Sequence, residues 1–280
     1  MNSDETTSPD TDLHAVYGYA SDRGLRRELN EDSLIAADPI FAVADGMGGH
    51  EAGEVASSLC VQTLAASAIV GEHLPELSAA ELEALLAEAD RRIRSASGGR
   101  AGTTLTGAVM VREAGVPHWL VFNVGDSRTY RLSRGVFEQI TVDHSEVQEL
   151  VAMGQITPEE ALVHPRRHVV TRALGTGSDT EADFWLIPLE PGDRLMVCSD
   201  GLTGEVSDSQ IAQILTSVAE PQEACADLVQ AALRSGGRDN VTVLVIDVEG
   251  GPAARGDEAD GSPGTAHREQ FDGAGRPAAE

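Results

Sequence analysis

The chain has 280 residues, 41% of them hydrophobic, and a formal net charge of −26. That length and apolar fraction are enough for one large domain with a real core. The charge argues against a surface for nucleic acid or anionic membranes, because both would repel it. No apolar run approaches the ~18 residues of a membrane span, and no basic, apolar leader opens the chain, so we expect a soluble, cytoplasmic protein.

The two ends of the chain differ in composition from the rest. Residues 1–12 are acidic and polar without periodicity, and residues 250–280 are rich in Gly, Pro, Ala and Asp. Such segments bury too little apolar surface to offset the entropy of ordering. We therefore expect two disordered tails around one folded domain at residues 13–249.

Hydrophobic patterning predicts many short strands and a few helices. Strands are predicted at residues 15–20, 33–36, 40–45, 103–111, 119–124, 128–132, 136–140, 184–187, 193–199 and 241–248. Helices are predicted at residues 51–69, 78–95, 207–218 and 221–233, the second with a capping pair at Ser78 and Glu81. Because strands outnumber helices and helices come in pairs, the pattern favours an α+β sandwich with antiparallel pairing over a doubly wound parallel sheet.

A polar insertion occupies residues 141–174, between predicted strands. It holds two predicted helical turns, at 147–153 and 158–162, and the side chains of His144, His164, Arg166, Arg167, His168 and Arg172. Insertions of this kind often act as lids or recognition segments. We therefore expect a flap here.

Four aspartates stand at the ends of apolar, strand-like runs. Asp45 ends residues 40–44, Asp126 follows residues 119–124 after one glycine, Asp200 ends residues 195–199, and Asp239 precedes residues 241–246. Strand ends of one sheet system gather at one edge, so these carboxylates can converge. Hard oxygen ligands are typical of Mg, Mn or Ca rather than zinc. The pattern predicts a metal-dependent enzyme.

The glycine-rich stretch at residues 40–53 reads as a strand, a turn and a helix. A phosphate-binding loop looks similar, but no G-K-[ST] follows, and Asp45 would repel phosphate unless a metal lay between them. The Gly46 carbonyl is then a candidate metal ligand. An EF-hand is disfavoured, because the acids do not alternate and no Glu stands at the twelfth position.

A charged stretch at residues 21–33 places Arg26 and Arg27 four to five positions before Glu31 and Asp32. Arginine suits phosphate because its planar fork makes two parallel hydrogen bonds. The alternative is a solvated charged loop without a ligand.

Together these pieces resemble the PPM, or PP2C-like, metal-dependent serine/threonine protein phosphatases, particularly the bacterial branch. The resemblance runs in the family's order from about residue 15 to 248. It rests on S-D-R-G-L-R-R-E-L-N-E-D-S (21–33), V-A-D-G-M-G-G-H-E-A-G-E (43–54), A-G-T-T (101–104), N-V-G-D-S-R (123–128), D-H-S (143–145), T-R-A-L-G (171–175), S-D-G-L (199–202) and R-D-N-V-T (238–242).

The resemblance implies a four-layer α-β-β-α sandwich, with two antiparallel sheets flanked by helices and a metal centre at one edge. Residues 13–249 would be the PP2C-like domain. Two Mn or Mg ions would be bridged by Asp45, and a third, weaker ion would bind at Asp126. The remaining implied ligands are Gly46, Asp200 and Asp239, with Glu31 and Asp32 acting through water.

The implied reaction is hydrolysis of phosphoserine and phosphothreonine in proteins by a metal-bridging hydroxide. Asp45 and Arg27 would be the catalytic residues, with Arg27 also binding the substrate phosphate. The implied partners are phosphoproteins, among them Ser/Thr kinases and their targets, with no nucleic acid or membrane partner. We expect a monomer that opposes bacterial Ser/Thr kinases.

One position departs from part of the family. Several eukaryotic members carry His after the D-G step, whereas this chain has Met47, so the proton donor to the leaving group is unassigned. His50 is near in sequence, but a helix-start histidine with local hydrogen bonds is the favoured interpretation. A non-catalytic phosphoprotein-binding member is disfavoured, because the carboxylates at 45, 200 and 239 are present. A regulatory phosphatase acting on anti-sigma antagonists would use the same chemistry.

Overall fold

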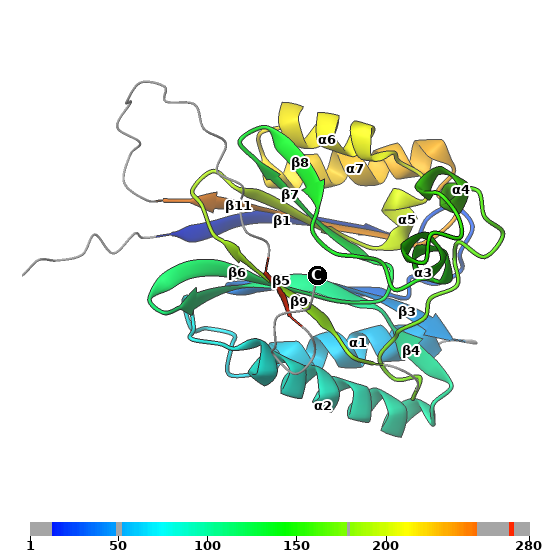
Figure 1. Cartoon of the computed structure of the whole chain (residues 1–280), viewed down its shortest axis with the longest axis horizontal. Helices are drawn as coiled ribbons and strands as arrows, with labels where there is room; N and C mark the ends of the chain where they lie inside the picture. The colour runs from blue at the N-terminus through cyan, green and yellow to red at the C-terminus, as the bar shows by residue number, and fades with distance from the viewer. Residues whose placement is uncertain (1–12, 49–51, 178–179, 251–268, 272–280) are drawn as a thin grey trace, which may run out of the picture.

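The computed structural model describes residues 13–48, 52–177, 180–250 and 269–271. Two β-sheets lie face to face, and helices cover their outer faces (Figure 1). The strands are β1 (His14–Asp22), β2 (Asp32–Ala37), β3 (Ile40–Gly48), β4 (Ala101–Thr103), β5 (Leu105–Glu113), β6 (Val116–Val124), β7 (Arg128–Ser133), β8 (Val136–Gln139), β9 (Asp183–Pro188), β10 (Arg194–Cys198), β11 (Val241–Glu249) and β12 (Glu269–Phe271). The helices are α1 (Ala52–Ala65), α2 (Ala79–Ser97), α3 (Glu146–Ala152), α4 (Pro158–Leu162), α5 (Asp200–Thr203), α6 (Asp208–Ser217) and α7 (Pro221–Ser235).

All strand pairs of the two sheets are antiparallel. One sheet has the order β1-β11-β10-β7-β8, and the other has the order β12-β9-β6-β5-β3-β2 with β4 added beside β3. Helices α6 and α7 cover the first sheet, and α1 and α2 cover the second (Figure 1). The four-layer α-β-β-α sandwich is therefore confirmed.

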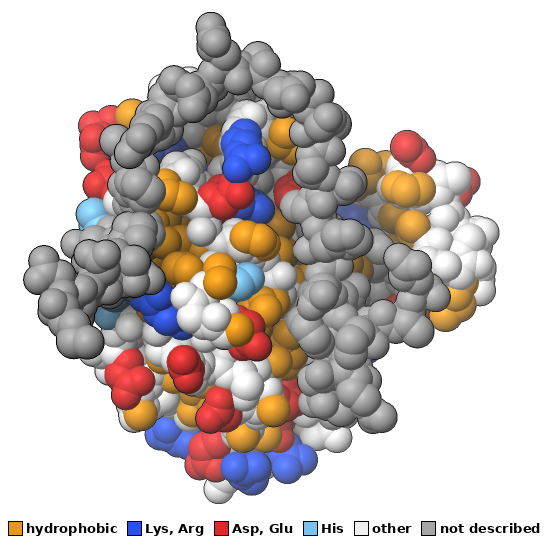
Figure 2. Space-filling model, turned by 60° about the vertical axis from the view of Figure 1, so that its left-hand side comes forward, with side chains coloured by type: hydrophobic (Ala, Val, Ile, Leu, Met, Phe, Trp, Pro, Cys, Tyr) orange, Lys and Arg blue, Asp and Glu red, His pale blue; other side chains and the backbone are white. Residues whose placement is uncertain are grey.

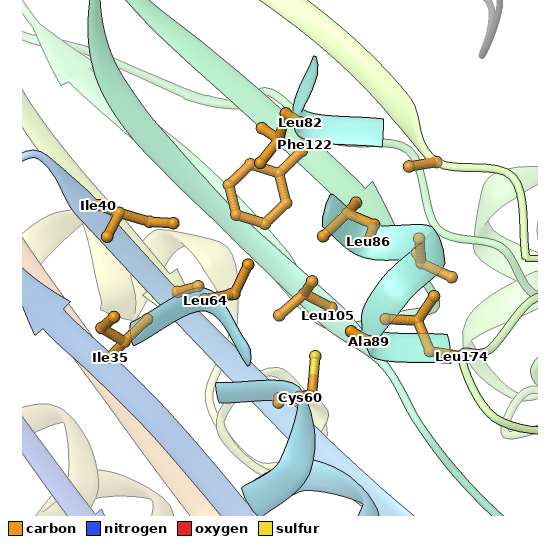
Figure 3. Close-up of a cluster of buried hydrophobic side chains, with 14 of the residues drawn as sticks. Ile35, Ile40, Cys60, Leu64, Leu82, Leu86, Ala89, Leu105, Phe122 and Leu174 are labelled. Atoms are coloured by element: carbon orange, nitrogen blue, oxygen red, sulfur yellow. The ribbon is translucent and has the colours of Figure 1, made fainter. Parts of the chain in front are cut away.

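The hydrophobic core has three layers, as a four-layer sandwich requires. The layer between the sheets contains the buried side chains of Phe41, Trp119, Trp185 and Leu244. The layer beneath α1 and α2 is shown in Figure 3, where side chains from both helices and from the adjoining strands point into one interior. A third cluster packs α6 and α7 against the first sheet.

Helix starts follow the capping signals in the sequence. The Ser78 and Glu81 pair forms a complete capping box at the start of α2, as predicted, and Gly98 ends that helix in a left-handed conformation. Pro221 occupies the first turn of α7. Helix α1, however, ends at Ala65 rather than at residue 69. The flap contains α3 and α4, close to the two predicted helical turns.

Some elements differ from the predictions. The strand predicted at 103–111 is two strands, because Thr104 leaves the ladder and its N–H donates to the Asp45 carbonyl at 2.9 Å. Strand β3 continues through Asp45 to Gly48, so Asp45 lies within a strand rather than at its end. The short helix α5 was not predicted.

The tail predictions fall largely outside the described residues. Residues 1–12 and 251–268 are not described, nor are residues 272–280, so disorder there stays a prediction. Strand β12 lies within the predicted 250–280 tail and pairs with β9, which the sequence did not indicate. His50 also lies outside the described residues.

The described surface mixes charges of both signs. On the face shown in Figure 2, acidic, basic and apolar side chains are interspersed rather than sorted into large single-sign areas. Among the described helices, none combines the length and the apolar character needed to cross a membrane.

Candidate metal centre

Carboxylates from five distant segments meet where the two sheets end. Asp32 on β2 lies directly across from Asp45 on β3. Asp200 and Asp45 are close enough to affect each other's pKa, and the charges of Asp126 and Asp239 also act on Asp45. The side chains at positions 45, 200 and 239 therefore lie close enough for their charges to interact. Their role as metal ligands stays a prediction.

Two polar side chains fix this end of the sandwich. The Ser199 hydroxyl donates to Asp32 Oδ2 at 2.8 Å and accepts from the Thr242 N–H at 3.0 Å. Asn240 accepts from the Glu31 N–H at 2.9 Å, and its amide donates to the carbonyl of Leu29 at 2.8 Å. These bonds tie the segment that carries Glu31 and Asp32 to β10 and β11 of the other sheet.

A close backbone approach explains the glycine that follows Asp45. The Gly46 N–H donates to the Glu31 carbonyl at 3.1 Å. A Cβ at Gly46 would overlap the backbone carbonyl of Gly53, at the start of α1. Only glycine lets the strand, the helix and the Glu31 segment meet here.

Burial and mutual repulsion raise the pKa of the clustered carboxyls. Desolvation is the largest cause at each, followed at Asp45 and Asp126 by neighbouring carboxylates. The pKa of Asp32 is raised to about 7 and that of Asp126 to about 8. The pKa of Asp45 is raised well above its ordinary value, and that of Asp200 is raised as well. The cluster therefore favours protons or cations over free negative charge.

The donor set fits a divalent cation with oxygen ligands. Asp32 Oδ1 is buried and has no hydrogen-bond partner, which leaves one lone-pair site unsatisfied. Within the described ranges, no three Asp, Glu, His or Cys side chains form a ready-made cage. A divalent ion would therefore need the Gly46 carbonyl and water to complete its shell, and Mg and Mn commonly retain water.

Arg27 supplies positive charge at the rim of the cluster. Its Nη2 donates to Asp239 Oδ2 at 2.7 Å, and the two side chains are 48% and 36% exposed. The hydrogen bond to Asp239 raises the pKa of Arg27, and the charges of Glu31 and Asp45 add to this. The guanidinium is held beside the carboxylates yet remains open to an anionic ligand.

The flap reaches the same end of the molecule (Figure 1). Burial and the charge of Asp239 raise the pKa of Asp200, and the charge of His168 in the flap partly opposes them. Arg166 pairs with Glu146, and Arg172 donates to Asp183 at 3.0 Å. Met47 is a half-buried residue of β3.

Sequence reasoning did not assign four residues that organise the site: Thr104, His144, Ser199 and Asn240. Each lies within a motif that carried the family resemblance. Their place within these motifs was the one feature of the sequence that could have indicated their importance. Their roles became visible only with their partners, since the side chains of Ser199 and Asn240 bond residues that lie 43 to 217 positions away along the chain.

A family model described as protein phosphatase 2C matches residues 26–235. The chain belongs to the protein phosphatase 2C family. Its similarity to PstP, a serine/threonine protein phosphatase of Mycobacterium tuberculosis, is 42% identity over 245 residues, or 83% of this chain. The match covers 45% of that relative, so the chain spans about half the length of PstP.

Other members of the protein phosphatase 2C family match over most of their own length. The serine/threonine phosphatase stp of Listeria monocytogenes is 38% identical over 249 residues, which cover 84% of this chain and 96% of the relative. The crystal structure of the PstP catalytic domain in complex with two manganese ions has a TM-score of 0.76 and 40% identity. It covers 85% of this chain and 99% of the PstP chain.

Proposed function

We propose that this member of the protein phosphatase 2C family hydrolyses phosphoserine and phosphothreonine in proteins, with Mn or Mg as cofactor. The observation that carries the proposal is the meeting of Asp45, Asp200 and Asp239 with Arg27 held against Asp239. Carboxylates for cations and an arginine for phosphate are the two requirements of metal-assisted phosphoryl transfer. The names of the PstP and stp relatives support the same activity.

Each residue has a distinct task in this proposal. Asp45, Asp200, Asp239 and the Gly46 carbonyl would hold two ions, and Asp126 would join a third, weaker site. Glu31 and Asp32 would act through water. When bound, two divalent ions supply an activated water and stabilise the negative charge that develops on phosphorus.

Arg27 would orient the phosphoryl group. Its fork can bond two phosphate oxygens, and Asp239 fixes the arginine side chain before substrate arrives. The rim position leaves room for a phosphorylated side chain of a protein, because Arg27 is half exposed. No serine or cysteine nucleophile is required.

The wider setting is also part of the proposal. The substrates would be phosphoproteins, among them Ser/Thr kinases and their targets, and the protein would act as a monomer in signalling in the cytoplasm. These statements rest on the reaction and on the relatives rather than on a contact in the structure.

Hydrolysis assays test the proposal. A phosphothreonine peptide and a small aryl phosphate are offered with Mn, with Mg and with chelator. We expect release of phosphate from both with metal and none with chelator. Asp227→Asn is the matched control, since it removes an exposed carboxylate on α7 that is not part of the cluster. Hydrolysis that survives chelation, or that is absent with every metal, would overturn the proposal.

A further inference from the structure

His144, the central residue of the D-H-S motif, forms hydrogen bonds with both backbone groups of Gly125. Its own N–H donates to the Gly125 carbonyl at 2.8 Å, and its ring Nδ1 accepts from the Gly125 N–H at 3.1 Å. The histidine is 6% exposed. Gly125 directly precedes Asp126, so these two hydrogen bonds, here called the His144 clamp, fix the turn from which the Asp126 carboxylate extends into the cluster.

The clamped turn has a backbone conformation that needs support. Gly125 has φ +112°, and a Cβ there would come within 2.6 Å of the Thr104 side chain. The Asn123 side chain donates to the same Gly125 carbonyl at 3.0 Å. Thr104 in turn bonds Ser127 at 2.7 Å and Asp45 through its backbone N–H. The turn is thus fixed between the Asp45 segment on one side and His144 on the other.

The imidazole of His144 is itself oriented by residues outside the turn. Because Nδ1 accepts a hydrogen bond, the ring proton lies on Nε2, which faces Asp183 Oδ2 at 3.2 Å. Asp183 also accepts from Arg172 of the flap at 3.0 Å. The base of the flap is joined to the same histidine, since the Thr171 N–H donates to the His144 carbonyl at 2.9 Å.

We propose that His144 is a positioning residue that holds the Gly125 turn so that Asp126 is prearranged for a divalent cation. Asp183 and Arg172 hold the ring, which links the base of the flap to this carboxylate. The metal part of the proposal rests on the proposed function. The clamp itself is a property of the protein without metal.

The chain offers substitutions that separate the clamp from general packing. His144→Asn retains an acceptor, because the amide oxygen falls near the place of Nδ1. His144→Leu keeps similar bulk and removes the acceptor. Thr141→Val is the matched control: Thr141 is 3% exposed, its hydroxyl accepts from the Thr129 N–H at 3.1 Å, and its own N–H donates to the Thr129 carbonyl rather than to Gly125.

The first measurement is hydrogen exchange of the Gly125 amide in metal-free protein. A buried hydrogen bond contributes on the order of 1 to 1.5 kcal/mol, so its loss speeds local opening roughly tenfold. We expect that change in His144→Leu, an exchange rate within about threefold of wild type in His144→Asn, and no change in Thr141→Val.

The second measurement is Mn binding by calorimetry, with Asp126→Ala as the reference for the weak site. We expect His144→Leu to weaken that site about tenfold and to leave the tighter binding intact. We expect His144→Asn to restore the weak site. Asp183→Ala removes the partner of the His144 ring without changing the Gly125 turn itself, and it should also lower the Mn affinity of the weak site. This variant keeps the test available if His144→Leu does not fold.

Three results would overturn the inference: equal effects of Asn and Leu at position 144, unchanged Gly125 exchange in His144→Leu, or an equal effect of Thr141→Val. A wild-type protein that binds no Mn would refute the proposed function and the metal part together. The amide exchange would then still decide whether the clamp exists, so the two failures are distinguishable.

Discussion

The buried carboxyl of Asp126 makes the stability of the metal-free protein depend on pH. Its pKa is raised to about 8 in the folded protein, by burial first and by Asp200 next, against about 3.9 in an unfolded chain. The folded state therefore binds the proton more tightly than the unfolded state does. The stabilising effect is complete below the unfolded pKa and is lost as pH rises toward 8.

The size of this effect follows from the two pKa values. With folded and unfolded values of about 8 and about 3.9, the ionisation penalty is about 1.5 kcal/mol at pH 5 and about 4 kcal/mol at pH 7. Ionisation of Asp126 alone should cost the metal-free protein the difference, about 2.5 kcal/mol, between these pH values. Asp126→Asn has no carboxyl at this position to ionise. Its free energy of unfolding should therefore fall by about 2.5 kcal/mol less than that of wild type between pH 5 and pH 7.

Urea denaturation with chelator at pH 5 and pH 7 measures the difference. Asp227→Asn serves as the control, because this carboxylate is exposed on α7. Added Mn should remove most of the pH dependence in wild type, since a cation replaces the proton. If the free energy of unfolding changes equally for wild type and Asp126→Asn between the two pH values, the claim that the buried Asp126 carboxyl makes stability depend on pH is refuted.

Three further outcomes are expected. Asp45→Asn should reduce turnover of a phosphothreonine peptide at least 1,000-fold by estimate and abolish tight Mn binding in calorimetry; near-normal turnover with Mn would contradict the bridging role. Arg27→Ala should lower kcat/KM roughly 10- to 100-fold, mainly through KM, because it loses charge-assisted hydrogen bonds; Arg27→Lys should recover only part, and a change confined to kcat would count against phosphate binding. Phe122→Ala, in the cluster of Figure 3, should cost about 3 to 5 kcal/mol in urea denaturation, whereas the exposed Val136→Ala should cost less than about 0.5 kcal/mol.

The layers of the fold were readable from the sequence, but the order of the strands was not. Residues 243–246 form a continuous apolar run because β11 is covered on both faces, by the second sheet and by α7. Nothing local in that run indicates that β11 lies between β1 and β10. Pairing between strands more than 200 residues apart is decided by tertiary packing, which short-range patterns do not encode.

The break at Thr104 shows the same limit at the scale of one residue. Threonine, leucine, valine and methionine fill most of the positions from Thr103 to Val111, so the sequence predicts one strand. The ladder is interrupted because Thr104 bonds Asp45 at both its N–H and its hydroxyl. A polar side chain with a remote partner here overrides local strand propensity.

The aspartates at positions 45, 126, 200 and 239 were found because each stands near the end of an apolar run, where side chains of different strands can meet. Their supports were not found, because a serine or an asparagine has no distinctive spacing. Ser199 acts on Asp32, 167 positions away, and Asn240 acts on Glu31, 209 positions away. Chemistry was therefore predictable from residue type, and its positioning required the fold.

The place of β11 has a consequence for synthesis on the ribosome. This strand is the last long one among the described residues, yet it fills the gap between β1 and β10. A nascent polypeptide that has emerged only as far as α7 lacks Asp239, Asn240 and the strand that joins β1 to the rest of its sheet. A prematurely terminated product ending there thus exposes two unpaired strand edges and is a substrate for aggregation or degradation rather than a partly active protein.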